Sequence, residues 1–341
     1  MRKLKLFFAV VFILSFSAAS YAFAPSVGFL KHNKPFKTGY LKVSDIHEIY
    51  YEQSGNPKGK PVFFLHGGPG VGFTANSRQA FDPKKFMVVL YDQRGCARSK
   101  PLYETRENTT GDLVEDIEKL RRHLNLGKTM LVGGSWGSTL ALAYAETYPE
   151  NVSSMVLRGT FLGTKEEDDH FYRHGGVDKF FPEVFEKITQ GLHEGAKDID
   201  RIRLTEFLKS SDPKIQQKFS RLWGYYEIKI SSLEIGDDIV ERIFDQNAGE
   251  MGLATLETHY SSNHWFLKKD QLAKNIGRLK GIPISMVSGR YDMITPPSSA
   301  YRIHKLLPNS KLYIVESAGH TDWEPAIAKK MIEAIENYSE L

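Results

Sequence analysis

A serine flanked by glycines, where a strand-like pattern gives way to a helical one, constrains this chain more than any other stretch. Residues 128–132 form a short, largely apolar run typical of a buried strand, and residues 138–148 carry the spaced apolar side chains of a packed helix. Between them lies Gly133-x-Ser135-x-Gly137. A chain that passes from strand to helix so abruptly needs strained backbone angles and close approaches, which glycine tolerates. The pattern predicts a sharp turn that presents the Ser135 hydroxyl above a sheet.

Two later segments place an acid and a base after strand-like runs. Residues 282–288 precede Asp292, and residues 311–315 precede His320. The order serine, aspartate, histidine suits nucleophilic catalysis on a parallel sheet. We therefore predict that Ser135 is the nucleophile, that His320 transfers its proton and that Asp292 orients the imidazole. Taken singly, a turn aspartate and a loop histidine are the alternatives.

A second glycine-rich loop lies upstream of the serine. Residues 61–65 form an apolar run typical of a strand buried on both faces, and HGGPG follows at 66–70. We predict that the backbone N–H groups of Gly68 and Trp136 bind a developing oxyanion. The alternative is that the loop is only a tight turn. His66 is interpreted as structural rather than as the base.

Strand-like and helix-like segments alternate up to residue 162, which predicts an α/β protein with a mostly parallel sheet flanked by helices. Residues 163–275 differ, because they are rich in charge and aromatic side chains and have helical periodicity. We predict that they form a helical cap inserted into a core made of residues 36–162 and 276–341.

The N-terminus has the pattern of a secretory signal peptide. Three of the four units of net positive charge lie within the first five residues, and an apolar run at 6–16 precedes small residues. We predict a signal peptide at residues 1–22 and an exported protein, periplasmic or secreted. A membrane anchor is the alternative, but eleven apolar residues are short for a bilayer. The rest of the chain is nearly neutral, so we expect neither nucleic acid nor, after cleavage, a membrane as partner.

The sequence predicts no metal and no cofactor. His170 with His174, and His259 with His264, are spaced like helical metal ligands, but neither pair has the glutamate of an H-E-x-x-H site or a clear third ligand. The single cysteine, Cys96, excludes an internal disulfide and is interpreted as a buried thiol.

Six strings in this order resemble the prolyl aminopeptidase (proline iminopeptidase) family of α/β-hydrolases. They are HGGPG (66–70), DQRGCARS (92–99), GGSWGS (133–138), LRGTFL (157–162), GRYD (289–292) and GH (319–320). The resemblance covers residues 36–340. It implies the α/β-hydrolase fold with an inserted helical cap, and a serine aminopeptidase that releases N-terminal proline from peptides with a free N-terminus.

The resemblance also implies residues that bind the substrate. WGYYE at 223–227 and LETHY at 256–260 are similar to the two family strings that carry amine-binding glutamates. This implies that Glu227 and Glu257 hold the free amine and that Phe161 lines the pocket for the proline ring. Considered without the resemblance, a solvated helix face is the alternative for each glutamate.

Two other functions fit parts of the pattern. An esterase or lactonase on the same scaffold would not need Glu227 and Glu257, because neutral esters carry no amine. A catalytically inactive binding protein with the same fold would show no covalent labelling of Ser135 by a fluorophosphonate probe. The chain departs from the family at Ala97, where glycine is usual, and at Tyr226, where tryptophan is usual.

Overall fold

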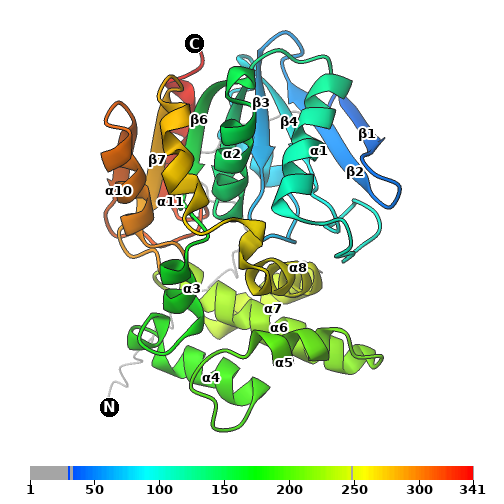
Figure 1. Ribbon diagram of the computed structural model, residues 1–341, viewed down its shortest axis with the longest axis vertical. Helices are drawn as coiled ribbons and strands as arrows, with labels where there is room; N and C mark the ends of the chain where they lie inside the picture. The colour runs from blue at the N-terminus through cyan, green and yellow to red at the C-terminus, as the bar shows by residue number, and fades with distance from the viewer. Residues whose placement is uncertain (1–29, 31–33, 247–248, 341) are drawn as a thin grey trace, which may run out of the picture.

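The computed structural model describes Leu30, residues 34–246 and residues 249–340. The larger of its two parts is built on one eight-stranded sheet (Figure 1). The predicted signal peptide lies outside the described residues. The strands follow the order β1-β2-β4-β3-β5-β6-β7-β8 across the sheet. Their bounds are β1 (Lys37–Lys42), β2 (Glu48–Gly55), β3 (Lys60–Leu65), β4 (Phe86–Tyr91), β5 (Thr129–Gly134), β6 (Val152–Arg158), β7 (Ile284–Gly289) and β8 (Lys311–Val315).

The sheet is parallel except at one edge. β1 and β2 form an antiparallel hairpin, and β2 pairs antiparallel with β4; from β4 to β8 every pairing is parallel. All residues of β4 and β7 are buried, as expected for parallel strands covered on both faces. β6 ends at Arg158 although the apolar run continues to residue 162, because Gly159 turns the chain at φ +54°.

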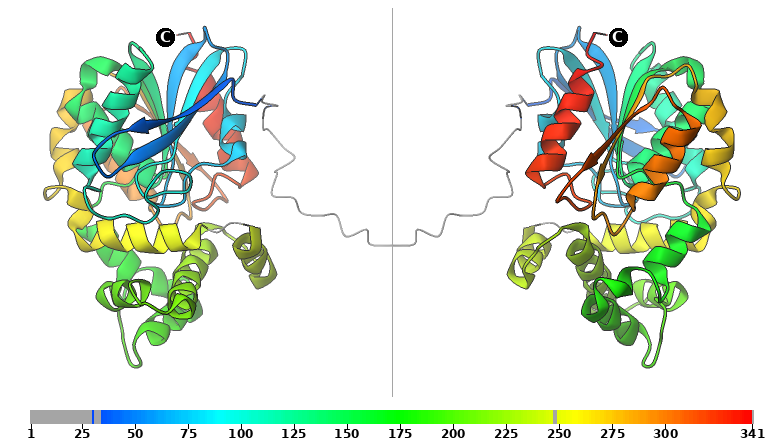
Figure 2. Two further views of the ribbon diagram at one scale, coloured as in Figure 1. Left: turned by 90° about the vertical axis from the view of Figure 1, so that its right-hand side faces the viewer. Right: turned by 90° about the vertical axis from the view of Figure 1, so that its left-hand side faces the viewer.

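Helices cover both faces of the sheet, so the predicted fold class is confirmed. α1 (Thr110–His123), α2 (Trp136–Thr147) and α10 (Pro297–Leu306) pack on one face in one apolar cluster. α11 (Pro325–Glu336) and the 3-10 helix Ala75–Ala80 lie on the other face (Figure 2). These helices do not cover the carboxyl ends of the parallel strands, where loops and other helices lie instead.

A group of helices, here called the cap, lies beyond the carboxyl ends of the strands (Figure 1). It consists of α3 (Lys165–Tyr172), α4 (Pro182–Leu192), α5 (Arg201–Leu208), α6 (Pro213–Ser231), α7 (Asp237–Gln246) and α8 (Glu250–Ser262). The cap has its own apolar core, in which Trp223 and Tyr226 of α6 are fully buried. The short α9 (Gln271–Asn275) packs instead on α2. Among the described helices, none has both the length and the apolar character needed to cross a membrane.

Local capping signals set the start of two helices beside the site. In α1, the Thr109 hydroxyl accepts from the Asp112 N–H, and the Asp112 carboxylate accepts from the Thr109 N–H at 3.0 Å. Thr164 and Glu167 form the same reciprocal box at the start of α3. Such boxes satisfy amides that the first helical turn leaves without partners. The capping box of Thr164 and Glu167 sets the start of α3 directly after the chain leaves the sheet.

Candidate active site

Ser135 lies at the strand-to-helix turn that the sequence predicted, between β5 and α2. Its backbone is in a strained conformation, φ 57° and ψ −127°. The flanking glycines allow the turn, because a Cβ on Gly133 would collide with the carbonyl of Gly137, and a Cβ on Gly137 would collide with the carbonyl of Leu65. The Ser138 hydroxyl donates to the Ser135 carbonyl at 2.7 Å and holds the turn in place.

Asp292 and His320 meet beyond the ends of β7 and β8. The imidazole Nδ1 lies 2.9 Å and 2.8 Å from the two Asp292 carboxylate oxygens. Asp292 is buried and accepts further hydrogen bonds from the N–H groups of Ile294 and Thr295 and from the Thr295 hydroxyl. Four donors therefore fix one carboxylate, which in turn orients the ring. The sequence analysis did not predict Thr295 as a site residue. The only local signal for it was its position three residues after Asp292.

The other imidazole nitrogen faces Arg158 at the end of β6. Arg158 Nη1 donates to His320 Nε2 at 3.0 Å and to the His320 carbonyl at 2.9 Å. Because a guanidinium has no acceptor, Nε2 must be the acceptor and Nδ1 the protonated nitrogen, which is the tautomer that a general base needs. The carbonyl of the same Arg158 accepts from the Ser135 N–H at 2.8 Å. Arg158 thus connects the serine turn to the histidine, and it was not predicted as a site residue.

Gly159 provides the space for this ring, and its replacement by alanine should lower kcat/KM about 100-fold. A Cβ would lie 2.9 Å from His320 Cε1 and 2.7 Å from Thr295 Oγ1, at a φ of +54°. A displacement of about 1 Å in a catalytic ring is worth on the order of 10²-fold. Gly195→Ala is the matched control, because Gly195 also has a positive φ but its Cβ would meet no described atom within 4 Å. Equal losses in both variants, measured by steady-state kinetics, would contradict the steric explanation.

The two predicted oxyanion residues lie with Ser135 around one cavity. Gly68, Ser135 and Trp136 all line it. The Trp136 indole donates to Gln93 Oε1 at 2.9 Å, and the Gln93 amide donates to the His66 carbonyl at the same distance. These bonds fix the HGGPG loop beside the serine turn. Burial lowers the pKa of His66, and its Nε2 accepts from the Gln93 N–H, as expected of a structural histidine.

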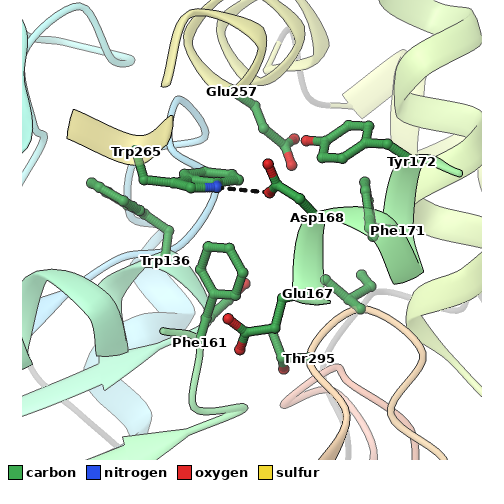
Figure 3. A pocket seen from close by; sticks show the side chains of 12 residues that line it. Trp136, Phe161, Glu167, Asp168, Phe171, Tyr172, Glu257, Trp265 and Thr295 are labelled. Carbon is green, nitrogen blue, oxygen red and sulfur yellow. Dashed lines mark hydrogen bonds between the residues drawn. The ribbon is translucent and has the colours of Figure 1, made fainter. Parts of the chain in front are cut away.

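The cavity lies between the sheet and the cap (Figure 3), and only about 20 Å³ of it is open to the centre of a water-sized sphere. Five of its twelve lining residues are aromatic and three are acidic. The aromatic residues are Trp136, Phe161, Phe171, Tyr172 and Trp265, and the acidic residues are Glu167, Asp168 and Glu257. Phe161, which was predicted to take the proline ring, is therefore placed in the wall.

Glu227 of α6 and Glu257 of α8 are brought together at the cap side of this cavity. Their carboxyl groups share a hydrogen bond, and Glu257 Oε2 also accepts from the Trp223 indole at 3.0 Å. Of the two, Glu257 is among the described residues that line the cavity and Glu227 is not. Burial raises the pKa of Glu227 to about 7, and burial together with the charge of Glu227 raises that of Glu257 well above its usual range. Two carboxyl groups this close resist joint ionisation, and a bound cation would favour the ionised form of both.

The histidine pairs considered as metal ligands are engaged elsewhere. His170 Nε2 hydrogen-bonds the Met293 carbonyl at 2.9 Å, and His259 Nε2 hydrogen-bonds the Asn108 carbonyl at 2.8 Å. Within the described part of the chain, no three histidine, cysteine or acidic side chains are arranged to hold a metal ion.

Comparison with known proteins first defines the class. The family model described as the alpha/beta hydrolase fold matches residues 60–324. An esterase from Exiguobacterium antarcticum superimposes with a TM-score of 0.62 at 20% identity, covering 89% of this chain and 100% of that one. A proline iminopeptidase-related protein from Thermus thermophilus gives 0.56 at 22% identity, covering 91% and 97%. At such identities the solved structures show the fold alone.

Curated relatives then define the family. A probable proline iminopeptidase from Leptolyngbya boryana is 42% identical over 305 residues, which is 89% of this chain and 94% of that protein. The proline iminopeptidase of Neisseria gonorrhoeae is 41% identical over 89% of this chain and 96% of its own length. That of Arabidopsis thaliana is 41% identical over 90% and 81%. The chain therefore belongs to the proline iminopeptidase family of α/β hydrolases, which confirms the resemblance found in the sequence.

Proposed function

We propose that this protein is a serine aminopeptidase that releases N-terminal proline, or a similarly small residue, from peptides with a free N-terminus. The observation that carries the proposal is the pair Glu227 and Glu257, the first partly buried and the second buried, joined by a hydrogen bond beside the cavity that contains Ser135. An enzyme that acts on neutral esters has no use for two carboxyl groups there. The names of the curated relatives support the same activity.

The proposed chemistry proceeds through an acyl-enzyme. Ser135 Oγ attacks the carbonyl carbon of the first residue while His320 Nε2 takes the hydroxyl proton, for which Arg158 must release Nε2. The N–H groups of Gly68 and Trp136 bind the oxyanion. The C–N bond then breaks and the leaving amine takes the proton from His320. Water, deprotonated by the same imidazole, hydrolyses the resulting ester and frees the amino acid.

The acidic pair explains why only the first residue is removed. A free N-terminal ammonium stabilises the ionised form of both Glu227 and Glu257, so that two carboxylates face it. An internal peptide nitrogen carries no charge and cannot compensate the burial of two carboxylates. The aromatic wall meanwhile suits an apolar ring.

Replacing Glu227 with glutamine should lower kcat/KM for a prolyl-arylamide about 100-fold and leave hydrolysis of a simple aryl ester within about twofold. The loss corresponds to one charge-assisted hydrogen bond to the ammonium. Glu186→Gln is the control, because Glu186 is an exposed acid on α4 of the same cap. Equal loss of both activities, or ester hydrolysis far above arylamide hydrolysis in the wild type, would favour the esterase alternative.

The wild type and Glu227→Gln should also differ in how KM for the arylamide depends on pH. A pKa of about 7 for Glu227 means that the carboxyl is protonated below that pH and ionised above it. KM for the arylamide should therefore fall as the pH rises through about 7, until the substrate amine itself loses its proton near pH 8. Glu227→Gln should flatten this part of the profile, and an unchanged profile would contradict the assignment.

Export remains a prediction for the N-terminal 22 residues. Their charge and apolar pattern supports a periplasmic or secreted location. N-terminal sequencing of protein from the periplasmic and medium fractions of an expressing bacterium would test it. A mature protein that begins at residue 23 is expected, and a retained residue 1 would contradict it.

A further inference from the structure

Asp168 and Trp265 form part of the cavity wall that neither the sequence patterns nor the family strings assigned. Asp168 lies on α3, and Trp265 lies 97 positions later in the 3-10 turn His264–Phe266 after α8. The Trp265 indole N–H donates to Asp168 Oδ1 at 2.9 Å (Figure 3). Both side chains line the cavity that contains Ser135.

The Trp265 ring forms the wall next to the position proposed for the substrate ring. It contacts Phe161 edge to face, with ring centroids 4.7 Å apart, and stacks on Trp136 at 5.7 Å. Only 3% of Trp265 is exposed. The place of this indole therefore sets how much room remains beside Phe161.

The backbone that delivers this indole does not hold its conformation by itself. His264, Trp265 and Phe266 have φ values of 51°, 57° and 50°, three consecutive non-glycine residues in the left-handed region. This conformation is disfavoured for residues with a Cβ and persists where surrounding contacts impose it. Two bonds to Trp265 do so here: the Thr110 hydroxyl donates to its carbonyl, and Asp168 accepts from its indole.

Asp168 is itself held firmly. Its side chain is 12% exposed, and its second oxygen accepts from Arg201 Nη1 at 3.3 Å. The Arg201 guanidinium lies over the Tyr172 ring, 4.4 Å from its centre. The neighbouring Glu167 also lines the cavity. Its carboxylate oxygens accept from the N–H groups of Leu162 and Thr164 and from the Ser299 hydroxyl, and these bonds cap the start of α3.

We propose that Asp168 is a positioning residue that determines specificity: by anchoring the Trp265 indole against Phe161, it restricts the pocket to an N-terminal residue with a compact apolar side chain, such as a pyrrolidine ring, and excludes larger ones. This inference rests on the proposed aminopeptidase function and adds the size of the accepted residue. Asp168 acts through Trp265 and is not assigned to the amine.

The test compares the ratio of kcat/KM for a prolyl-arylamide to that for a phenylalanyl-arylamide. Asp168→Leu and Trp265→Phe should each lower this ratio about tenfold or more, chiefly by lowering KM for the larger substrate, since removing a steric limit on one side chain is worth on the order of 10- to 200-fold. The double variant should show no further change. Trp265→Phe keeps an aromatic ring and all the ion pairs, so it tests the idea even if Asp168→Leu folds poorly.

Two further variants separate positioning from charge. Asp168→Asn keeps an acceptor for the indole N–H, so it should retain the wild-type ratio within about twofold. A direct contact between Asp168 and the ammonium predicts instead that Asn raises KM for both substrates alike. Asp169→Asn is the matched control, because Asp169 is the next residue on α3 and makes only surface ion pairs with Lys165 and Arg173.

A readout independent of turnover is hydrogen exchange of the Trp265 indole N–H, identified in the NMR spectrum by its loss in Trp265→Phe. Exchange should be slow in the wild type and in Asp168→Asn and faster in Asp168→Leu. A proportional loss of activity on both arylamides in Asp168→Leu, additive effects in the double variant, or unchanged indole exchange would overturn the inference. A wild type inactive on both arylamides would instead overturn the proposed function, and the specificity with it, while the exchange data would still decide whether Asp168 anchors Trp265.

Discussion

Replacing Ser135 with alanine should abolish turnover of a prolyl-arylamide, with a loss of kcat on the order of 10⁶-fold. The fold should survive, because alanine keeps the Cβ and the strain at φ 57° is unchanged; only the hydroxyl is removed. Steady-state kinetics measures the loss, and circular dichroism with a thermal melt checks that the protein is folded. Labelling by a fluorophosphonate probe should disappear in the same variant.

A second serine provides the control for this experiment. Ser153 lies near the start of β6, at the opposite end of the sheet from the cavity, and within the described residues its hydroxyl has no hydrogen-bond partner. Ser153→Ala should therefore keep full activity and full labelling. Turnover by Ser135→Ala near the wild-type rate, in a folded protein, would remove the basis for covalent catalysis and would reopen the possibility of a silent binding protein.

Replacing Asp292 with asparagine should lower kcat about 10⁴-fold, the second largest effect we expect. Asparagine can still accept from the N–H groups of Ile294 and Thr295 through its single carbonyl oxygen. Its amide group then faces His320 Nδ1 and donates to it. The imidazole must place its proton on Nε2, and this tautomer cannot accept the proton of Ser135.

The control for this second variant lies on the same loops. Glu316 is an exposed acid four residues before His320 and pairs with Arg290 at 2.7 Å on the surface. Glu316→Gln removes one negative charge from this end of the sheet without touching the imidazole, so its kcat should stay within about twofold of wild type. If both variants lost activity to the same degree, general electrostatics rather than the tautomer of His320 would explain the loss. Thermal melts of both variants should agree with the wild type within a few degrees.

Local signals in the sequence were sufficient where a residue's environment depends on its near neighbours. The turn at Ser135 follows from the glycines on either side of it, which permit backbone contacts that any Cβ would block. The strand after residue 60, the buried parallel strands and the helical segment after residue 162 follow from changes in periodicity along the chain. Because parallel strands end at the same edge of a sheet, the order of the strands also indicated that Asp292 and His320 would lie near that turn.

The acidic run at 166–169 shows where local reasoning fails. Its four carboxyl groups look alike in the sequence, a charged first turn of a helix. In the structure Glu167 closes the start of α3, Asp168 anchors an indole in the cavity wall, and Asp169 pairs with surface cations. Helical periodicity indicates which face of α3 each residue occupies. It does not indicate which other segment that face meets.

The sequence by itself therefore determined the class of fold and the strained serine turn, because these depend on backbone sterics and on periodicity over a few residues; the roles of Asp292 and His320 as acid and base stay predictions. Only the tertiary structure decided that Arg158 bonds to His320, that Glu257 rather than Glu227 lines the cavity, and that Asp168 holds an indole 97 positions away. These contacts depend on how the cap helices pack on one another and on the sheet. That packing is a sum of many weak contacts between distant segments, and no short stretch of sequence contains it.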